Sequence, residues 1–363
     1  MAKTAAAMVQ AGDREVRVSS PDRVIYEATD RTPEVTKLMV AEYFVAVEDG
    51  LMRALRDRPT ALERWPDGYR EGFRLSTGYG DDGEGFYQKR VPKGAPDYVD
   101  PVRITFPSGR TAEEICSTEI AVPVWCAQMG TLTFHPWPVR RADVDHPDEL
   151  RIDLDPQPGT GFADAVRVAG VADELLRELG LVGFPKTSGN RGVHVYVRIE
   201  PRWTFEDVRH AAIAFGRELA RRDEQVTTAW WKEERGERIF VDFNQNNRDR
   251  TIASAYSLRP KPGAPVSTPV TWSELPEVSD PRDFNLFTVT ERVADGDPWA
   301  AIDEASYSLE PLLDLWQQQV DAGEGELNFP PDYPKMPGEP PRVQPSKKVA
   351  EHWDEQGNRV EGT

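Results

Sequence analysis

Hydrophobic and polar positions alternate with two different periods in the centre of the chain. Apolar residues at every second position or in short runs, the pattern of strands, cover residues 150–156, 194–199 and 238–243. Apolar residues with helical spacing, the pattern of amphipathic helices, cover residues 161–181 and 204–222. This mixture of strands and helices predicts an α+β (mixed α/β) enzyme core.

The pattern is less regular in the N-terminal half. Residues 31–55 predict a helix with Thr32 as N-cap and Pro33 at the first helical position. Residues 70–85 are rich in glycine and acidic residues and predict a long exposed loop. A strand-like segment at 85–92 follows this loop.

The C-terminal part is acidic and rich in proline. Residues 308–320 predict a last helix, and the proline-rich stretch at 328–348 predicts an extended arm or disordered tail. We therefore predict three parts of the chain: a flexible lead-in at 1–20, a catalytic domain at 21–300, and an extension at 301–363.

Composition restricts the class of protein. A chain of 363 residues with 39% hydrophobic residues can bury a large core, and no export signal or membrane span is evident in its pattern. Cys116 and Cys126 have no second Cys/His pair near them, so we expect both to pack in the core and not to bind zinc. Together these features predict a cytoplasmic protein, associated with the nucleoid if it acts on DNA.

The charge of the chain argues against a generic nucleic-acid binder. The formal net charge is −18, of which −12 lies from Glu277 onward, where 7 Lys/Arg stand against 19 Asp/Glu. The remaining −6 is spread over 276 residues that also contain clusters of basic side chains. A local basic path over an acidic body is therefore compatible with the sequence.

Two aspartates, Asp153 and Asp155, share one face of the strand predicted at 150–156. Because side chains of a strand alternate between faces, Ile152 and Leu154 enter the core while the two carboxylates lie together. Adjacent carboxylates repel unless one is protonated or a cation lies between them, and magnesium binds such pairs together with substrate phosphates. The pair indicates a metal site, although exposed strand ends carry the same pattern more often.

A third aspartate, Asp242, lies near the middle of the apolar strand predicted at 238–243. A buried aspartate needs a partner, which could be an arginine such as Arg259 or a metal ion. Three carboxylates from two strands could hold two divalent ions about 3.5–4 Å apart, the arrangement that polymerases use.

A short loop of small residues at 188–192 precedes the strand at 194–199. Its glycines allow backbone N–H groups to approach a phosphate, and Ser188 and Arg191 add side-chain donors, although a plain turn would look the same. His135 could be a packed core histidine. Arg259 could make a surface ion pair, but its planar fork also suits a triphosphate.

Five segments taken together resemble the archaeo-eukaryotic primase superfamily, and most closely the polymerase domain of bacterial DNA ligase D. In chain order they are FHPW, LRIDLDP, TSGNRGVHVYV, FVDFNQN and YSLR, within a similarity that runs over residues 21–275. The resemblance implies a primase-type catalytic core, with two subdomains of mixed sheets around a central cleft.

The resemblance also implies roles for individual residues. The implied metal ligands are Asp153, Asp155 and Asp242. The implied nucleotide-binding residues are His135, Ser188, Asn190, Arg191, Gln245 and Arg259. Within this set Ser188 could sense the ribose 2′-hydroxyl, Gln245 would support the site from behind, and Arg191 replaces a lysine that is common in the family.

Further residues are implied to contact DNA. Phe86 and Tyr87 would stack on the nucleic acid beside the templating base, with Lys89 toward phosphate. Arg64 would lie near the DNA, and a downstream 5′-phosphate would be bound by Arg23, Arg31 or Arg64. Residues 32–34 read Thr-Pro-Glu where a further lysine would be expected, and the loop at 70–85 looks inserted relative to the family.

The function that the resemblance implies is template-directed filling of short gaps or ends by two-metal nucleotidyl transfer. The implied cofactors are two divalent ions, Mn²⁺ or Mg²⁺, with NTP or dNTP as substrate and ribonucleotides accepted. The implied partners are gapped or broken duplex DNA, a separately encoded ATP-dependent DNA ligase and Ku. The alternatives are a D-x-D metal-dependent glycosyltransferase and a DNA end-bridging module with incidental polymerase activity.

Overall fold

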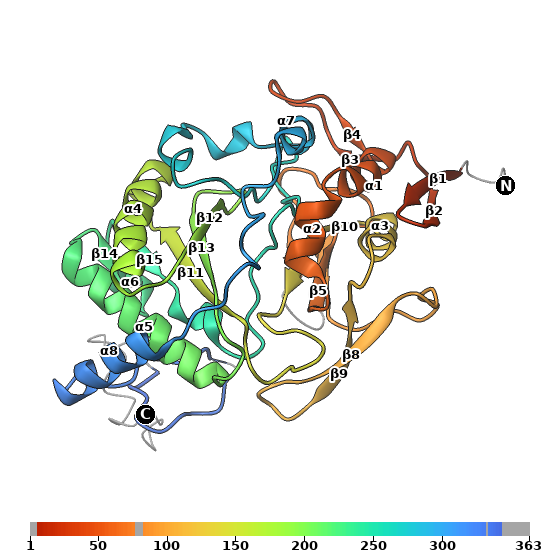
Figure 1. Cartoon of the computed structure of the whole chain (residues 1–363). Helices are drawn as coiled ribbons and strands as arrows, with labels where there is room; N and C mark the ends of the chain where they lie inside the picture. The colour runs from red at the N-terminus through yellow and green to blue at the C-terminus, as the bar shows by residue number, and fades with distance from the viewer. Residues whose placement is uncertain (1–5, 77–82, 332, 343–363) are drawn as a thin grey trace, which may run out of the picture.

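The computed structural model describes residues 6–76, 83–331 and 333–342, which form two subdomains side by side (Figure 1). The sheet of the N-terminal subdomain contains β5 (Pro59–Arg64), β6 (Leu75–Ser76), β7 (Gly85–Gln88), β8 (Asp100–Thr105), β9 (Thr111–Cys116) and β10 (Thr131–Pro136). Its strand order is β6-β7-β5-β9-β8, and β10 pairs with β5.

The sheet of the second subdomain holds the predicted central strands. It contains β11 (Glu149–Pro156), β12 (Phe184–Thr187), β13 (Val193–Arg198), β14 (Val226–Thr227) and β15 (Ile239–Val241), in the order β12-β13-β11-β15-β14. Each sheet includes one parallel pair, β6 with β7 and β14 with β15, beside antiparallel pairs. The expected α+β fold with two subdomains of mixed sheets is therefore confirmed.

Helices cover both sheets. The N-terminal subdomain has α1 (Lys37–Ala46), α2 (Glu48–Leu55) and α3 (Ala121–Gln128), and α7 (Leu286–Arg292) joins the same core. The second subdomain has α4 (Phe162–Glu178), α5 (Phe205–Arg222), α6 (Lys232–Arg235) and α8 (Glu310–Asp321). Short 3₁₀ helices are η1 (Phe243–Asn246), η2 (Leu275–Glu277), η3 (Pro281–Asp283) and η4 (Val293–Asp295). The helices predicted at 161–181, 204–222 and 308–320 are confirmed.

Residues 6–19 are not a flexible lead-in, so the prediction is wrong for this described part of the segment 1–20. They form a hairpin of β1 (Ala6–Ala11) and β2 (Arg14–Ser19), which places Val9, Val16 and Val18 in the core beside α1 and α3. Residues 6–19 contain no long apolar run, which is why the sequence did not predict strands here. The alternating valines of β2 become buried against the helices, and this burial stabilises the hairpin.

The first helix begins four residues later than the sequence predicted. Residues Val35–Thr36 form β4, which pairs with β3 (Val24–Tyr26), and Thr36 caps α1 by accepting from the backbone N of Met39. Thr32 instead bonds with Thr29 in a tight turn. Strand pairing therefore decides which threonine starts the helix.

The loop predicted at 70–85 is only partly confirmed. Leu75 and Ser76 form a short strand parallel to β7, and Glu84 accepts from the backbone N of Arg74. The middle of the predicted loop, residues 77–82, lies outside the described residues.

The C-terminal region packs onto the second subdomain as far as it is described. α8 packs against α5, and the arm that follows returns along α5 (Figure 1). Arg209 of α5 pairs with Glu326, donates to the carbonyl O of Leu327 at 2.8 Å and lies 3.7 Å from the ring centroid of Phe329. α8 and the arm as far as Leu327 thus add to the core of the second subdomain, so this part of the predicted extension is not a separate unit.

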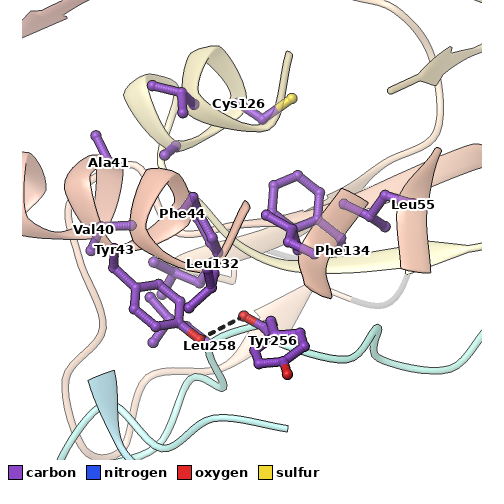
Figure 2. Close-up of a cluster of buried hydrophobic side chains, with 14 of the residues drawn as sticks. Val40, Ala41, Tyr43, Phe44, Leu55, Cys126, Leu132, Phe134, Tyr256 and Leu258 are labelled. Atoms are coloured by element: carbon purple, nitrogen blue, oxygen red, sulfur yellow. Dashed lines mark hydrogen bonds between the residues drawn. The ribbon is translucent and has the colours of Figure 1, made fainter. Parts of the chain in front are cut away.

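The core of the N-terminal subdomain brings distant segments together. Figure 2 shows Phe44 of α1 and Phe134 of β10 packed beside Leu55, and Tyr43 donating to the carbonyl O of Tyr256 at 2.9 Å. The rings of Phe44 and Phe134 meet edge to face, with centroids 5.2 Å apart. Cys126 packs in the same cluster, and both cysteines are free and buried, as predicted.

Phe44→Ala is expected to lower the free energy of unfolding by about 3–5 kcal/mol, because it leaves a cavity where a fully buried ring was lost. Urea denaturation followed by circular dichroism measures this. The control is Val182→Ala, at a side chain that is 42% exposed, where a change within about 0.5 kcal/mol is expected. Equal stability of the two variants would contradict the packing in Figure 2.

Candidate active site

Three aspartates meet where β11 and β15 end. Along β11, Ile152 and Leu154 are buried while Asp153 and Asp155 line one cavity, so the predicted alternation is confirmed. Leu154 pairs with Val241 of β15, and the backbone N of Asp242 donates to the carbonyl O of Asp153 at 3.1 Å. The sheet therefore brings Asp242 beside the other two carboxylates.

Asp242 does not lie in the middle of a strand, which corrects the prediction. The strand ends at Val241, and Asp242 caps η1 by accepting from the backbone N of Asn244 at 3.1 Å. Its other carboxylate oxygen accepts from Nε2 of Gln245 at 3.0 Å. Gln245 thus orients Asp242, the supporting position that the sequence predicted for it.

The carboxylate cluster is electrostatically unfavourable by itself. Burial raises the pKa of Asp153 well above its ordinary value, and the nearby charges of Asp242 and Asp155 raise it further. Burial also raises the pKa of Asp242, although the hydrogen bond from Gln245 opposes this. Such a set of oxygen donors fits hard divalent cations such as Mg²⁺ or Mn²⁺, whose charge would offset the repulsion.

The cavity beside these carboxylates measures about 210 Å³ and collects most of the predicted nucleotide-binding residues. Its lining includes the residues His135, Asp153, Asp155, Ser188, Asn190, His194, Gln245 and Arg259. Arg191 is absent from this lining and faces a neighbouring cavity, where it donates to the carbonyl O of Pro156 at 3.3 Å. The structure thus brings together all the predicted nucleotide-binding residues except Arg191.

The Ser188 loop is held in shape by its own hydrogen bonds. Oγ of Ser188 accepts from the backbone N of Asn190 at 3.2 Å and of Gly192 at 3.0 Å. Gly189 has φ +70°, and a Cβ on it would lie 2.5 Å from Cγ of Arg259. Glycine is therefore required where this loop passes the arginine.

Arg259 has a fixed backbone and an unpaired side chain. Its backbone N donates to the carbonyl O of Pro265 at 2.8 Å, and its carbonyl O accepts from the hydroxyl of Tyr26 at 3.0 Å. Its guanidinium makes no hydrogen bond or ion pair with any residue that the structure describes. It lies near enough to lower the pKa of His135, Lys186 and Asp153 through its charge. An unpaired guanidinium in a cavity is suited to an anionic ligand.

The side chain of His135, on β10, is held by Glu63 of the neighbouring strand β5. Its Nε2 lies 3.0 Å from Oε2 of Glu63, whose Oε1 accepts from Nε1 of Trp65 at 3.1 Å. The ring of Tyr87 meets the ring of His135 edge to face, with centroids 5.3 Å apart. Burial lowers the pKa of His135, and Glu63 opposes that shift.

Comparison with known proteins shows which family this chain resembles. Residues 36–299 match the family model for the LigD primase-polymerase domain. The chain is 34% identical over 303 residues to the multifunctional non-homologous end joining protein LigD of Pseudomonas aeruginosa, covering 82% of this chain and 34% of that protein. The chain is 30% identical over 331 residues to the protein of the same name in Mycolicibacterium smegmatis. That alignment covers 88% of this chain and 40% of the relative.

A solved structure agrees with the sequence relatives. The polymerase domain from Mycobacterium tuberculosis ligase D in complex with DNA matches with a TM-score of 0.70 at 26% identity, covering 80% of this chain and 99% of that one. This chain belongs to the LigD primase-polymerase domain family. Its fold is the primase-type fold that the five segments implied, and it is a nucleotidyltransferase of the polymerase class. The glycosyltransferase alternative is therefore wrong.

The chain spans about two fifths or less of the length of the curated LigD relatives. Among the residues that the structure describes, no helix has the length and apolar character needed to cross a membrane.

The predicted DNA contacts of this LigD-type domain are not all on one face. Phe86 and Tyr87 are neighbours on β7 and point to opposite sides, so the guanidinium of Arg64 lies over the ring of Phe86 while Tyr87 meets His135. Arg64 also donates to the carbonyl O of Met129, and Lys89 pairs with Asp249 at 2.6 Å. Tyr87, which is 45% exposed, contacts His135, a residue that lines the cavity beside the aspartates.

A basic pair was missed near Arg23. Arg23 itself pairs with Asp67 at 2.7 Å. The later start of α1 places Lys37 at its first turn, with Nζ donating to the carbonyl O of Ser19 at 2.9 Å. Burial and the charge of Arg23 lower the pKa of Lys37 to about 8. A lysine therefore does lie in this region, five residues after Thr32, where the sequence prediction found none.

Sequence reasoning also missed two buried side chains behind Asp153. His194 lies opposite Asp153 in the β11–β13 pair and opposite Lys186 in the β12–β13 pair. Nε2 of His194 is 3.4 Å from Oδ1 of Asp153, and its Nδ1 is 2.8 Å from Nζ of Lys186. Correct strand pairing would have predicted this chain of contacts, because residues opposite each other in a sheet touch.

Glu63→Gln is expected to lower the pKa of His135 further, because it removes the charge that opposes the effect of burial. The pKa of Glu63 is held below its ordinary value despite burial, because it bonds with His135. Its stabilising effect is therefore present above about pH 4.5 and is lost as pH falls through its folded pKa. NMR titration of the His135 ring measures the shift; an unchanged titration would contradict the contact.

Proposed function

We propose that this domain is a template-directed DNA repair polymerase that fills short gaps or ends during the joining of broken DNA. The observation that carries the proposal is one cavity in which Asp153 and Asp155, with Asp242 beside them, oppose the unpaired Arg259. A site of this composition can hold cations on one side and a triphosphate on the other.

Asp153, Asp155 and Asp242 would hold two divalent ions, Mg²⁺ or Mn²⁺, because all three are hard oxygen donors and repel one another without a cation. When bound, such ions lower the pKa of a primer 3′-hydroxyl and offset the charge of the triphosphate. His194 would position Asp153, since its Nε2 lies 3.4 Å from that carboxylate.

The opposite wall would bind the nucleotide. Arg259 offers a planar fork of donors to the non-transferred phosphates, and the loop with Ser188 and Asn190 offers its amides and side chains. His135 would donate through the ring nitrogen that Glu63 does not occupy. Tyr87 has an exposed face that can stack on a base.

Two basic regions support binding of DNA. Lys89, Arg90 and Arg110 line a groove of about 280 Å³ together with the ring of Phe106, which combines cations with an aromatic surface. On the other side, Arg23 and Lys37 lie close enough for one charge to lower the pKa of the other. An anion between these two would relieve their repulsion, so we assign the downstream 5′-phosphate to them.

The relatives support the setting in which this polymerase works. Those proteins are end-joining proteins by name, and the structural neighbour was solved with DNA. A nick left after gap filling requires a ligase, and we propose a separately encoded ATP-dependent DNA ligase and Ku as partners, in the cytoplasm at the nucleoid. Acceptance of ribonucleotides is part of the same proposal.

A primer-extension assay tests this function. The substrates are duplexes with short gaps, with and without a 5′-phosphate, offered NTP or dNTP in Mn²⁺ or Mg²⁺. We expect templated addition that is strongest on 5′-phosphorylated gaps, and no addition by Asp155→Asn. Absence of templated addition under all these conditions would overturn the proposal and favour an end-bridging module, which DNA pull-down between two labelled ends would detect.

A further inference from the structure

A second cavity, of about 700 Å³, adjoins the candidate active site across the Ser188 loop. Ser188 and Gly192 line the active-site cavity, Gly189 and Arg191 line the second one, and Asn190 lines both. We call the second space the outer cavity. Asn190 is therefore the residue that the linings of the two cavities share.

The segment after Arg259 repeats this division. Arg259 lines the active-site cavity, and Lys261, two residues later, lines the outer cavity. The backbone N of Lys261 donates to the carbonyl O of Arg259 at 2.8 Å, so the two residues keep a fixed relation. The Ser188 loop and the segment after Arg259 thus each place polar or cationic residues in the active-site cavity and further ones in the outer cavity.

The outer cavity is cationic although the chain carries a net charge of −18. Its lining includes four cations, Arg31, Arg191, Lys261 and Arg282, against two acids, Asp30 and Asp280. Asp280 pairs with Arg31 at 3.0 Å and with Arg282 at 2.7 Å. Arg191 and Lys261 have no carboxylate partner among the residues that the structure describes. Two positive charges therefore line this space without an ion pair, and the four cations outnumber the two acids.

We propose that the outer cavity is a pyrophosphate subsite, which receives the leaving pyrophosphate on its way out of the active site. This inference rests on the proposed function. In that reaction the primer 3′-oxygen forms a bond to the α-phosphorus and loses its proton to water. The bond from the α-phosphorus to the bridging oxygen breaks, and that oxygen leaves with the electron pair as part of pyrophosphate.

The charges in the two cavities explain why pyrophosphate would leave the active site through the outer cavity. Pyrophosphate is a compact polyanion, so the aspartate cluster repels it, while cations with free donors attract it. Arg259 stands in the active-site cavity, and Arg191 and Lys261 stand in the outer one. Positive charge is therefore present in both adjoining cavities, while Asp153 and Asp155 line only the active-site cavity.

The test uses Lys261→Glu in the full chain, with Lys335→Glu as the matched control. Lys335 is an exposed lysine in the C-terminal arm, outside both cavities. Primer extension is measured while inorganic pyrophosphate is titrated. We expect Lys261→Glu to raise the inhibition constant of pyrophosphate about tenfold or more, the factor that one charge-assisted contact supplies. The control should match the wild type.

A second measurement separates this subsite from a DNA site and from the polymerase proposal. Calorimetric titration of the DNA-free protein with pyrophosphate should give weaker binding for Lys261→Glu than for Lys335→Glu. If Lys261→Glu instead weakens only the binding of DNA, measured by fluorescence anisotropy, or leaves both pyrophosphate constants unchanged, the subsite is overturned. If the wild type binds pyrophosphate through Lys261 but never extends a primer, the subsite stands and the proposed function fails.

Discussion

Asp153→Asn is expected to abolish primer extension and, at the same time, to raise the Tm of the metal-free protein. A carboxylate that holds a catalytic cation contributes several kcal/mol to the barrier, which corresponds to a loss of about 10³-fold or more in rate. The gain in stability has a separate cause. Burial and the two neighbouring aspartates raise the pKa of Asp153, so at neutral pH the folded protein must either bury its charge or take up a proton, and both cost stability.

The sign of this pH effect follows from linkage. An acid whose pKa is raised on folding stabilises the fold at low pH and destabilises it increasingly as pH rises from its unfolded to its folded pKa. The difference in Tm between Asp153→Asn and the wild type should therefore be largest above that range and vanish at low pH. The control is Asp314→Asn, at an exposed position on α8. A lower Tm for Asp153→Asn at neutral pH, or retained extension activity, would contradict this assignment.

Arg259→Ala is expected to lower kcat/KM for the nucleotide by about 10²-fold, with little change in the affinity for DNA. Each charge-assisted hydrogen bond contributes about 1.5–3 kcal/mol, and the guanidinium of Arg259, which lines the cavity, can present two parallel N–H donors to a phosphate. The loop should keep its shape in the variant, because the backbone of Arg259 is bonded to Pro265 and Tyr26.

Arg259→Lys serves as the matched variant for the Arg259 prediction. It keeps the charge but loses the planar fork, so we expect activity between the wild type and Arg259→Ala. Steady-state kinetics on a gapped duplex, with nucleotide varied at saturating DNA, separates the two effects. If Arg259→Ala weakens DNA binding instead of nucleotide use, Arg259 does not face the triphosphate.

The face of β11 that carries Asp153 and Asp155 could be predicted from sequence because the information is local. Alternation along one strand places Asp153 and Asp155 on the same side, whatever the rest of the fold does. The position of Asp242 was harder to predict. The apolar run around it reads as a continuous strand, but the ladder ends at Val241 and the carboxylate caps the turn that follows.

Contacts between distant strands could not be predicted from the chain alone. Glu63 and His135 are 72 residues apart and meet only because β5 pairs with β10. A buried glutamate on a strand has no local pattern that reveals its partner. The same holds for Lys186, whose partner His194 depends on the register of β12 against β13.

Competition between similar local patterns explains the errors near the N-terminus. Thr32-Pro33 and Thr36-Lys37 are both acceptable helix starts, and the pairing of Val35 with Tyr26 selects the second. The choice matters for the proposed 5′-phosphate site, because it brings Lys37 close to Arg23.

The central claim is that Asp153, Asp155 and Asp242 bind divalent cations together. It is tested most directly by a crystal grown with Mn²⁺ and a non-hydrolysable nucleotide, measured at the manganese absorption edge. We predict anomalous peaks within ligand distance of all three carboxylates, which disappear in Asp153→Asn, and a triphosphate in contact with Arg259. Manganese bound elsewhere, or a site that leaves Asp242 without a metal contact, would contradict the account.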